Sequence, residues 1–323
     1  MVAQVFENPL RPAILAAARS TTLKAAITRA PVTRSIVKRF IAGETRAEAL
    51  TAARAILDTG RLISIDHLGE DTTDEAKAGA AVAEYLALLS DLAELPEARE
   101  PGGVRPLEVS VKLSALGQAL PVDGREIALA NARTLCAAAE RAGVWITVDA
   151  EDHTTTDSTL SIVRELRADH PWLGAVLQSY LRRAETDCRD LAGPESRIRL
   201  CKGAYREPES VAFQAKADVD ASYLRCLRVL MEGGGYPMVA SHDPVIIAEA
   251  DSMASGSGRD SADFEHQMLY GIRDGEQLRL AGLGAQMRVY LPYGGQWYGY
   301  FMRRLAERPA NLGFFVRSVF TRD

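Results

Sequence analysis

The sequence contains little cysteine and lacks several patterns that would assign a class at once. Its four cysteines form no CxxC pair and no zinc-finger spacing, which is typical of free thiols in a reducing cytosol. No apolar run approaches the ~18 residues of a membrane-spanning helix. There is no P-loop and no GxGxxG motif: the nearest match, Gly256-Ser257-Gly258, lacks the third glycine and follows no predicted strand. The five histidines form neither HxH nor HExxH.

The bulk composition is that of an ordinary globular protein. Apolar residues make up 47% and charged residues 25%, which excludes disordered and low-complexity classes. The net charge of −5 argues against a nucleic-acid binder. A length of 323 residues fits two domains, or one α/β barrel, which routinely uses about 250 residues or more.

Charge is distributed unevenly along the chain. The first 48 residues hold eight Lys/Arg and three Asp/Glu, a net charge of +5, so the remainder carries −10. We interpret residues 1–58 as an N-terminal helical arm and 59–323 as the main domain. The arm either wraps the core or forms a basic amphipathic helix of the transit or membrane-surface type. Liposome flotation with and without residues 1–48 distinguishes these two readings, since identical behaviour excludes membrane contact.

After the arm, short apolar, β-branched runs alternate with longer helical patterns. Eight runs are predicted strands: Leu62–Asp66, Leu107–Lys112, Trp145–Asp149, Ala175–Gln178, Ile198–Lys202, Met238–His242, Glu265–Tyr270 and Met287–Leu291. Stretches with helical spacing lie between them, for example Glu75–Leu92, Arg125–Ala142, Ser158–Ala168 and Val211–Met231. Eight βα units predict an α/β fold, a distorted (βα)8 TIM-type barrel. A doubly wound open sheet is the main rival.

Polar residues gather where the predicted strands end, which is where a barrel places its functional groups. These residues are Lys112, Asp149, Glu151, Gln178, Arg199, Lys202, Tyr205, Ser241, His242 and Tyr290. Six strand ends with such groups at equivalent positions predict one shared site at the mouth.

A second group follows the last strand. Tyr300, Arg303, Arg304 and Glu307 recur at i, i+3, i+4 and i+7 and therefore share one helical face. Two adjacent guanidinium groups suit a planar carboxylate ligand. The spacing is equally typical of a solvated salt-bridge helix in which Glu307 pairs with both arginines.

Several of these segments together resemble the proline dehydrogenase family. The segments are Ser110–Gly117, Asp149-Ala150-Glu151, Arg199–Tyr205, Ser241-His242 and the Tyr300-x-x-Arg303-Arg304-x-x-Glu307 pattern. The resemblance runs from about Leu62 to the last helix and is strongest to the short, monofunctional bacterial enzymes. It implies non-covalent FAD and oxidation of L-proline to Δ1-pyrroline-5-carboxylate by hydride transfer to flavin N5, the first step of proline catabolism to glutamate. Electrons would then pass to a quinone-type acceptor.

The resemblance also implies a role for each matching residue. Lys112, Arg303 and Arg304 would hold the proline carboxylate and Tyr290 would pack against the ring. Asp149 would be the active-site acid, and Arg199 would lie beside flavin N5. The remaining cofactor-binding positions would be Val148 through its backbone, Gln178, Cys201, Lys202, Gly203, Ala204, Ser241, His242 and Glu307.

Other functions stay open at this point. A metal-dependent barrel hydrolase would use Asp149, Glu151 and His242, and a Schiff-base enzyme would use Lys112 or Lys202. A related flavoenzyme acting on hydroxyproline and a non-catalytic binding protein are further alternatives. We expect a cytoplasmic location, with peripheral contact at the inner face of the cell membrane if the arm binds lipid.

Overall fold

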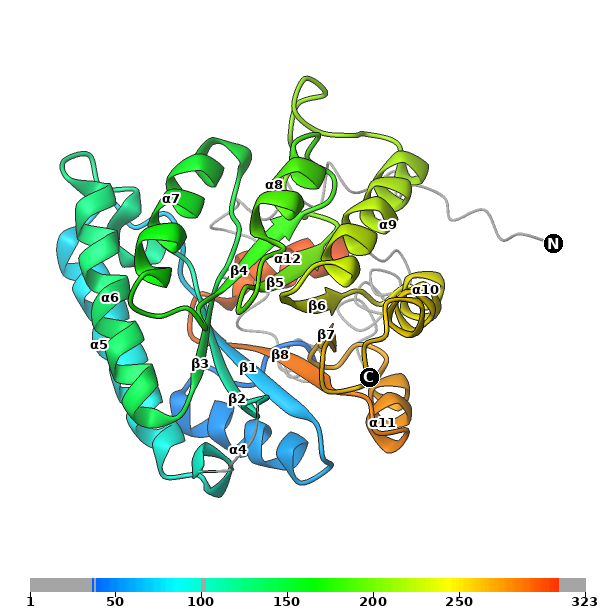
Figure 1. The fold of residues 1–323 in the computed structure, drawn as a ribbon. Helices are drawn as coiled ribbons and strands as arrows, with labels where there is room; N and C mark the ends of the chain where they lie inside the picture. Colours follow the sequence, from blue (N-terminus) through cyan, green and yellow to red (C-terminus); the bar gives the residue numbers. More distant parts are fainter. Residues whose placement is uncertain (1–36, 38, 100–102, 308–323) are drawn as a thin grey trace, which may run out of the picture.

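The computed structural model describes residues 37, 39–99 and 103–307, with the backbone alone for residues 303–307. Eight parallel strands close into a barrel in which β1 pairs with both β2 and β8 (Figure 1). The strands are β1 (Leu62–His67), β2 (Leu107–Val111), β3 (Trp145–Val148), β4 (Gly174–Gln178), β5 (Arg197–Cys201), β6 (Tyr236–Ala240), β7 (Glu265–Leu269) and β8 (Met287–Tyr293). The predicted TIM-type barrel is confirmed, and the open sheet is excluded.

Helices follow the strands around the outside of the barrel. They are α4 (Arg46–Leu57), α5 (Glu75–Ala93), α6 (Gly124–Ala142), α7 (Thr156–Arg167), α8 (Ala184–Leu191), α9 (Lys216–Glu232), α10 (Pro244–Gly256), α11 (Asp274–Gly282) and α12 (Trp297–Glu307), with short turns η1 (Pro96–Arg99), η2 (Ser114–Gln118) and η3 (His153–Thr155). The Asp74 side chain caps α5 by accepting from the Ala76 and Lys77 N–H groups. Gly143 ends α6 with a φ of 69°, as its sequence position predicts.

The predicted helix Val211–Met231 is wrong at its beginning. The structure begins α9 only at Lys216. The preceding backbone pairs with the β4–α8 loop instead: Phe213 N–H donates to the Tyr180 carbonyl, and Arg182 N–H donates to the Val211 carbonyl. These cross-loop hydrogen bonds replace the i to i+4 bonds of a helix, and they anchor the loop after β5 over the end of β4.

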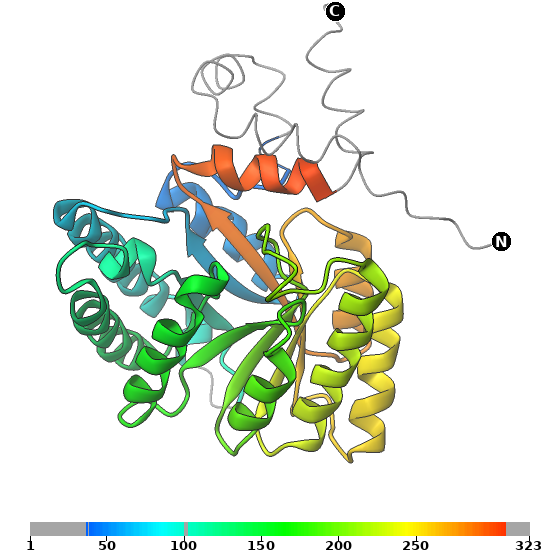
Figure 2. The same ribbon diagram turned by 90° about the horizontal axis from the view of Figure 1, so that it is seen from above.

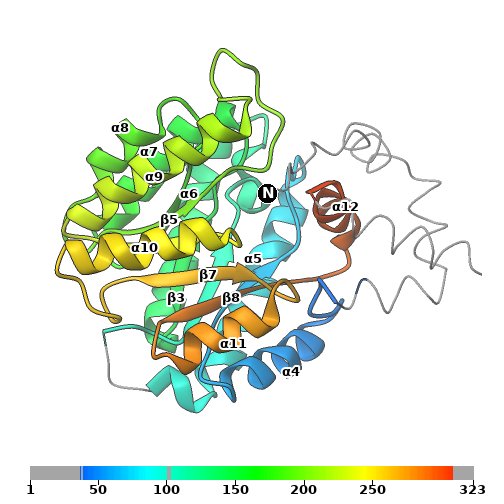
Figure 3. The same ribbon diagram turned by 90° about the vertical axis from the view of Figure 1, so that its right-hand side faces the viewer.

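Two helices depart from a regular barrel. The helix that packs beside β1 and β8 on the outer wall is α4, which precedes the first strand. Its Ala49, Ala53 and Ile56 share one face and are buried in the main core. The helix after β8, α12, instead lies across the carboxyl end of the barrel (Figure 2). Figure 3 shows the strands running toward α12, while α4 lies beside α11 and β8.

A separate apolar cluster holds α12 in place. Trp297 and Phe301 pack with Phe40 and Ile41 from the segment before α4, and with Leu68 from the loop after β1. Most of the predicted arm lies outside the described residues, so the division at 58/59 stays a prediction. No helix in the described part of the chain is both long enough and apolar enough to cross a membrane.

The barrel wall and the barrel interior differ in chemistry. Strand residues that face the helices are apolar, for example Ile63, Val109 and Ile146, and belong to the main core. The alternate positions point inward, where barrels are usually filled by bulky branched side chains. Here the buried polar and charged strand residues include Ser64, Asp66, Glu108, Ser110, Thr147, Gln178, Arg197, Arg199, Glu265, Gln267 and Arg288. The mouth of this barrel is therefore built on a charged interior.

Candidate active site

Four of the predicted site residues form one contact network at the carboxyl end of the barrel. Arg199 Nη1 donates to Asp149 Oδ1 at 2.7 Å, and the Tyr290 hydroxyl donates to Asp149 Oδ2 at 2.7 Å. Lys112 Nζ lies 3.7 Å from the same Oδ2. The side chains come from β5, β8 and the residues that directly follow β2 and β3, so strand closure brings them together.

Lys112 is held by a carboxylate from the neighbouring strand. Its Nζ donates to both oxygens of Asp66, each at 2.8 Å, and the Asp66 side chain is 1% exposed. Burial disfavours the ammonium, but Asp66 and Asp149 outweigh that effect and raise the pKa of Lys112. Lys112 is therefore a fixed cation, which disfavours its use as a Schiff-base nucleophile because that role needs a neutral amine.

Arg199 occupies the centre of the interior between two carboxylates. Its Nη1 bonds Asp149 and also the Ser110 hydroxyl at 3.0 Å, while its Nη2 donates to Glu108 Oε1 at 2.7 Å and to the Ser64 hydroxyl at 3.3 Å. Burial opposes the charge, but Asp149 and Glu108 outweigh it, so the pKa of Arg199 is raised. Both ends of the guanidinium are thus fixed by charge-assisted hydrogen bonds.

Asp149 is a buried carboxyl group whose pKa is raised by its surroundings. Burial raises its pKa above the ordinary aspartate value, and the negative charge of Asp66 adds to that effect. The positive charges of Arg199 and Lys112 and the hydrogen bond from Tyr290 act in the opposite direction without cancelling it. Asp149 therefore combines a fixed position with the capacity to change its charge.

We expect the Tyr290→Phe substitution to raise the pKa of Asp149 further. The phenol donates to the carboxylate, and a donor favours the ionised form, so its removal shifts the titration to higher pH. An NMR titration of the labelled Asp149 carboxyl measures this shift. Tyr293→Phe is the matched control, because that hydroxyl bonds Glu84 at 2.9 Å on another side of β8. Equal titrations in both variants would contradict the assigned bond.

Strands β4 and β5 form a second wall of the mouth. Gln178 is 5% exposed, and its Oε1 has no hydrogen-bond partner among the described residues. Gly203 has a φ of 109°, and a Cβ at this position would lie 2.4 Å from the Tyr180 ring. Any side chain there would clash, so the backbone at Gly203 passes tightly over Tyr180. The buried Gln178 amide oxygen without a partner is typical of a site for a polar ligand.

The other predicted cofactor residues lie along the same rim. Lys202 donates to Asp220 at 2.6 Å and to Asp243 at 3.1 Å. His242 Nε2 accepts the Leu269 N–H at 3.0 Å, so this nitrogen carries no proton. The Ser241 hydroxyl accepts the Asp243 N–H at 3.1 Å.

Three further predicted cofactor positions are Val148, Cys201 and Ala204. The Val148 side chain belongs to the main core, so only its backbone borders the mouth. The Cys201 carbonyl accepts the Ser179 N–H at 2.8 Å, and Ala204 follows Gly203 in the next loop.

Arg303, Arg304 and Glu307 lie on α12, the helix that crosses the mouth. Their side chains lie outside the described residues, and the roles predicted for them stay predictions. On the same helix, Tyr300 is buried in the apolar cluster that holds α12.

The structure does not assemble the alternative sites. The described part of the chain contains no group of three or more His, Cys, Asp or Glu side chains that could hold a metal ion. Asp149 is engaged by Arg199, and Glu151 accepts hydrogen bonds from the Ser114 N–H and hydroxyl. Lys202 is held in ion pairs with two aspartates. None of these arrangements matches the metal-hydrolase or Schiff-base predictions.

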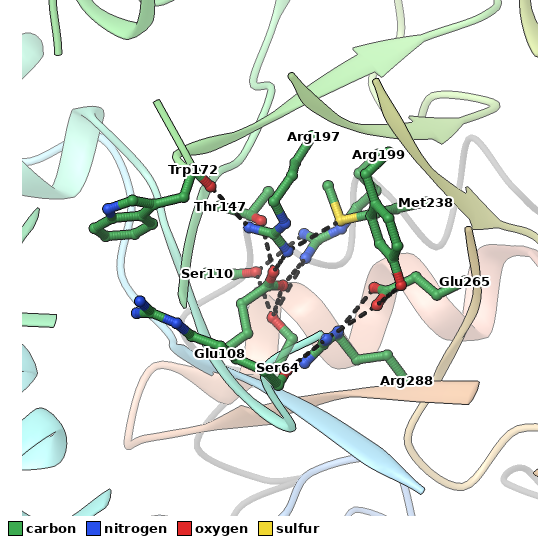
Figure 4. Close-up of polar contacts among 12 residues, drawn as sticks. Ser64, Glu108, Ser110, Thr147, Trp172, Arg197, Arg199, Met238, Glu265 and Arg288 are labelled. Carbon is green, nitrogen blue, oxygen red and sulfur yellow. Dashed lines mark hydrogen bonds and ion pairs between the residues drawn. The ribbon is translucent and has the colours of Figure 1, made fainter. Parts of the chain in front are cut away.

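Sequence reasoning missed the residues beneath the mouth. Asp66 anchors Lys112, and Glu108 bridges Arg199 and Arg197 in the interior (Figure 4). Deeper still, Arg288 Nε donates to Glu265 Oε1 at 2.7 Å. The available signal was the alternation of polar and apolar residues within the strands, which places the polar set on the inward side.

Comparisons with known proteins agree on one family. A model of the family described as "Proline dehydrogenase" matches residues 49–317. Proline dehydrogenase of Deinococcus radiodurans is 41% identical over 291 residues, covering 88% of this chain and 90% of that protein. Proline dehydrogenase 1 of Bacillus subtilis is 36% identical over 287 residues, covering 89% and 91%.

A solved structure supports the same relation. Proline utilization A (PutA) from Bdellovibrio bacteriovorus, in a form inactivated by N-propargylglycine, superposes with a TM-score of 0.78 at 26% identity. The match covers 88% of this chain and 34% of that one, so the present chain corresponds to about a third of the PutA polypeptide.

Proposed function

Because the chain belongs to the proline dehydrogenase family, we propose that it is a monofunctional enzyme that oxidises L-proline to Δ1-pyrroline-5-carboxylate with non-covalently bound FAD. The observation that carries the proposal is the network of Lys112, Asp149, Arg199 and Tyr290 at the barrel mouth. It offers fixed cations, a titratable carboxyl group and an aromatic ring within one set of contacts. These groups match a small apolar ring that carries one carboxylate and one secondary amine.

One feature of the mouth supports a bound FAD. The Gln178 amide oxygen is buried without a hydrogen-bond partner among the described residues, so it can accept a hydrogen bond from a polar ligand. FAD supplies the hydride acceptor that protein side chains do not supply. Gln178, Gly203, Ala204, Ser241 and His242 would hold it, together with Lys202 and the backbones of Val148 and Cys201, and Glu307 would contact it from α12.

Substrate position comes from the cations and from Tyr290. Lys112, Arg303 and Arg304 would grip the carboxylate, while Tyr290 packs against the ring. An ammonium has three N–H donors, and Asp66 takes two of them, so Lys112 can hold a further acceptor without losing its anchor. Fixing a small substrate in this way lowers the barrier chiefly through proximity and orientation.

Asp149 and Arg199 would provide the local field. Asp149 would orient the proline amine, which must lose a proton before its lone pair assists departure of the hydride. Arg199 would present a fixed positive charge beside the reactive edge of the flavin, and such preorganised charge stabilises developing negative charge. Neither group needs to move on binding, because both are already held by hydrogen bonds.

The visible spectrum tests this function directly. We expect the purified protein to be yellow, and L-proline to bleach its visible band under anaerobic conditions. D-proline serves as the control for non-specific reduction. A colourless protein that cannot be reconstituted with FAD, or a flavin that L-proline leaves oxidised, would contradict the proposal.

Electron transfer to a quinone-type acceptor and peripheral membrane contact belong to the same proposal. Their support is the basic composition of the first 48 residues, most of which lie outside the described part of the chain. The flotation comparison with and without residues 1–48 is the test of the membrane contact.

A further inference from the structure

The most connected buried carboxylate in the barrel is Glu108, a residue on β2 that the proposed function does not use. Its side chain is fully buried, and it accepts hydrogen bonds from four side chains on three other strands, β1, β3 and β5 (Figure 4). The donors are Ser64 at 2.7 Å, Thr147 at 2.9 Å, Arg199 at 2.7 Å and Arg197. Two carboxylate oxygens offer about four acceptor positions, so Glu108 is saturated.

Glu108 and Asp149 hold opposite ends of the Arg199 guanidinium. Glu108 binds Nη2 from the closed side of the barrel, and Asp149 binds Nη1 from the mouth. A substrate that engages Asp149 therefore leaves the Glu108 bond intact. The position of Arg199 then depends on Glu108, whose buried carboxylate no ligand reaches.

The net pKa shifts of the two carboxyl groups are opposite, although burial raises the pKa of both. Burial alone would raise the pKa of Glu108, but the arginines Arg197, Arg288 and Arg199 outweigh it, so the pKa is lowered and Glu108 stays ionised. At Asp149 burial prevails, and the pKa is raised. One partner of Arg199 is thus a permanent charge and the other a variable one.

We propose that Glu108 is a positioning residue for the reaction: it fixes Arg199 from below and supplies the buried negative charge that balances Arg199 when Asp149 engages a ligand. This inference rests on the proposed function, because it assumes that Arg199 acts beside the flavin. A positioning role differs from a merely structural one in that it alters the charge balance at Asp149 and at the cofactor.

The chain offers a matched control in the same interior. Glu265 is also fully buried, and it binds Arg288 through two hydrogen bonds, at 2.7 and 2.9 Å. Its hydrogen bonds go to Arg288, Gln267 and Tyr236 rather than to Arg199. Glu108→Gln and Glu265→Gln each break a buried ion pair, and both should lower stability. Only the first should alter the chemistry at the mouth.

The test compares the pH profile of kcat/KM for L-proline and the midpoint potential of the bound flavin in these two FAD-loaded variants. Asp149 is faced by Arg199 from β5, Lys112 after β2, Asp66 from β1 and Tyr290 from β8. Removing the Glu108 charge relieves repulsion of the Asp149 carboxylate, so the pKa of Asp149 falls. The limb of the pH profile that reports the titration of Asp149 then moves to lower pH. The flavin potential becomes more positive, and kcat/KM falls on the order of tenfold to a hundredfold.

Further variants keep the inference falsifiable if Glu108→Gln does not fold. Glu108→Asp retains the charge and should keep the limb and the potential near the wild-type values. Arg197→Met removes a positive charge while leaving the bond between Glu108 and Arg199, so it should move the limb to higher pH. The inference would be overturned if the pH profile of kcat/KM and the flavin potential stayed at the wild-type values in Glu108→Gln and Arg197→Met. Equal shifts of these two quantities in Glu265→Gln would also overturn it. Failure of the wild-type protein to oxidise proline would instead overturn the proposed function.

Discussion

In the Arg199→Met variant, we expect kcat for L-proline to fall on the order of a hundredfold to a thousandfold, with FAD still bound. Methionine removes a charge fixed by Asp149 and Glu108 while keeping the unbranched apolar stem of the side chain. Removal of one preorganised charge from a desolvated site has this size of effect on catalysis. KM should change much less, because in the proposed site Lys112 and the arginines of α12 would hold the carboxylate of the substrate.

Arg197→Met is the matched control for this variant. Arg197 precedes Arg199 by two residues on β5, is equally buried, and binds the other oxygen of Glu108. It has no hydrogen bond to Asp149. We expect its kcat, measured at its own pH optimum, to stay within a few-fold of the wild-type value. A similar loss in both variants would show that Arg199 matters only for packing and would remove it from the reaction.

The second large effect is expected in the Arg304→Met variant. If Arg304 grips the substrate carboxylate in a desolvated clamp, its loss costs about 2–5 kcal/mol of binding. KM for L-proline should then rise roughly thirtyfold or more, while the FAD content of the purified protein stays unchanged. Steady-state kinetics together with the flavin-to-protein absorbance ratio measure both quantities.

Arg279→Met distinguishes the clamp from a solvated salt-bridge helix. Arg279 pairs with Glu276 on the exposed surface of α11, and such pairs contribute little. If Arg304 were a surface residue of the same kind, the two variants would have equal, near-wild-type KM values. That outcome would exclude Arg304 from substrate binding.

The fold could be predicted closely because the strand residues that pack against the helices are mostly apolar. Apolar residues facing the helices marked most of the strands. In Glu265–Leu269 the outward positions are His266 and Met268, so the pattern is weaker there. Helix α9 was predicted to begin too early because residues 211–215 have helical composition, and nothing local reveals their bonds to the loop after β4. The position of α12 over the mouth was likewise not readable from the chain, since it depends on packing against Phe40 and Ile41.

The site was predictable at the strand ends and not below them. Lys112 and Asp149 could be found because each is a polar residue that directly follows a buried strand, and Arg199 because it begins the Arg199–Tyr205 segment that resembles the family. Glu108 and Asp66 were missed, although each alternates with apolar neighbours as an inward-facing residue should. A barrel interior is expected to be apolar, so a charged residue in mid-strand carried no obvious meaning until its partners from three other strands were seen around it.

A crystal structure of the FAD-loaded protein with a bound, unreactive proline analogue tests the central claim most directly. We expect the carboxylate of the analogue to lie between Lys112 and the paired arginines of α12, with its ring between Tyr290 and the flavin and with Arg199 still bound to Glu108. An analogue bound elsewhere, or a flavin that does not border Arg199, would contradict this claim.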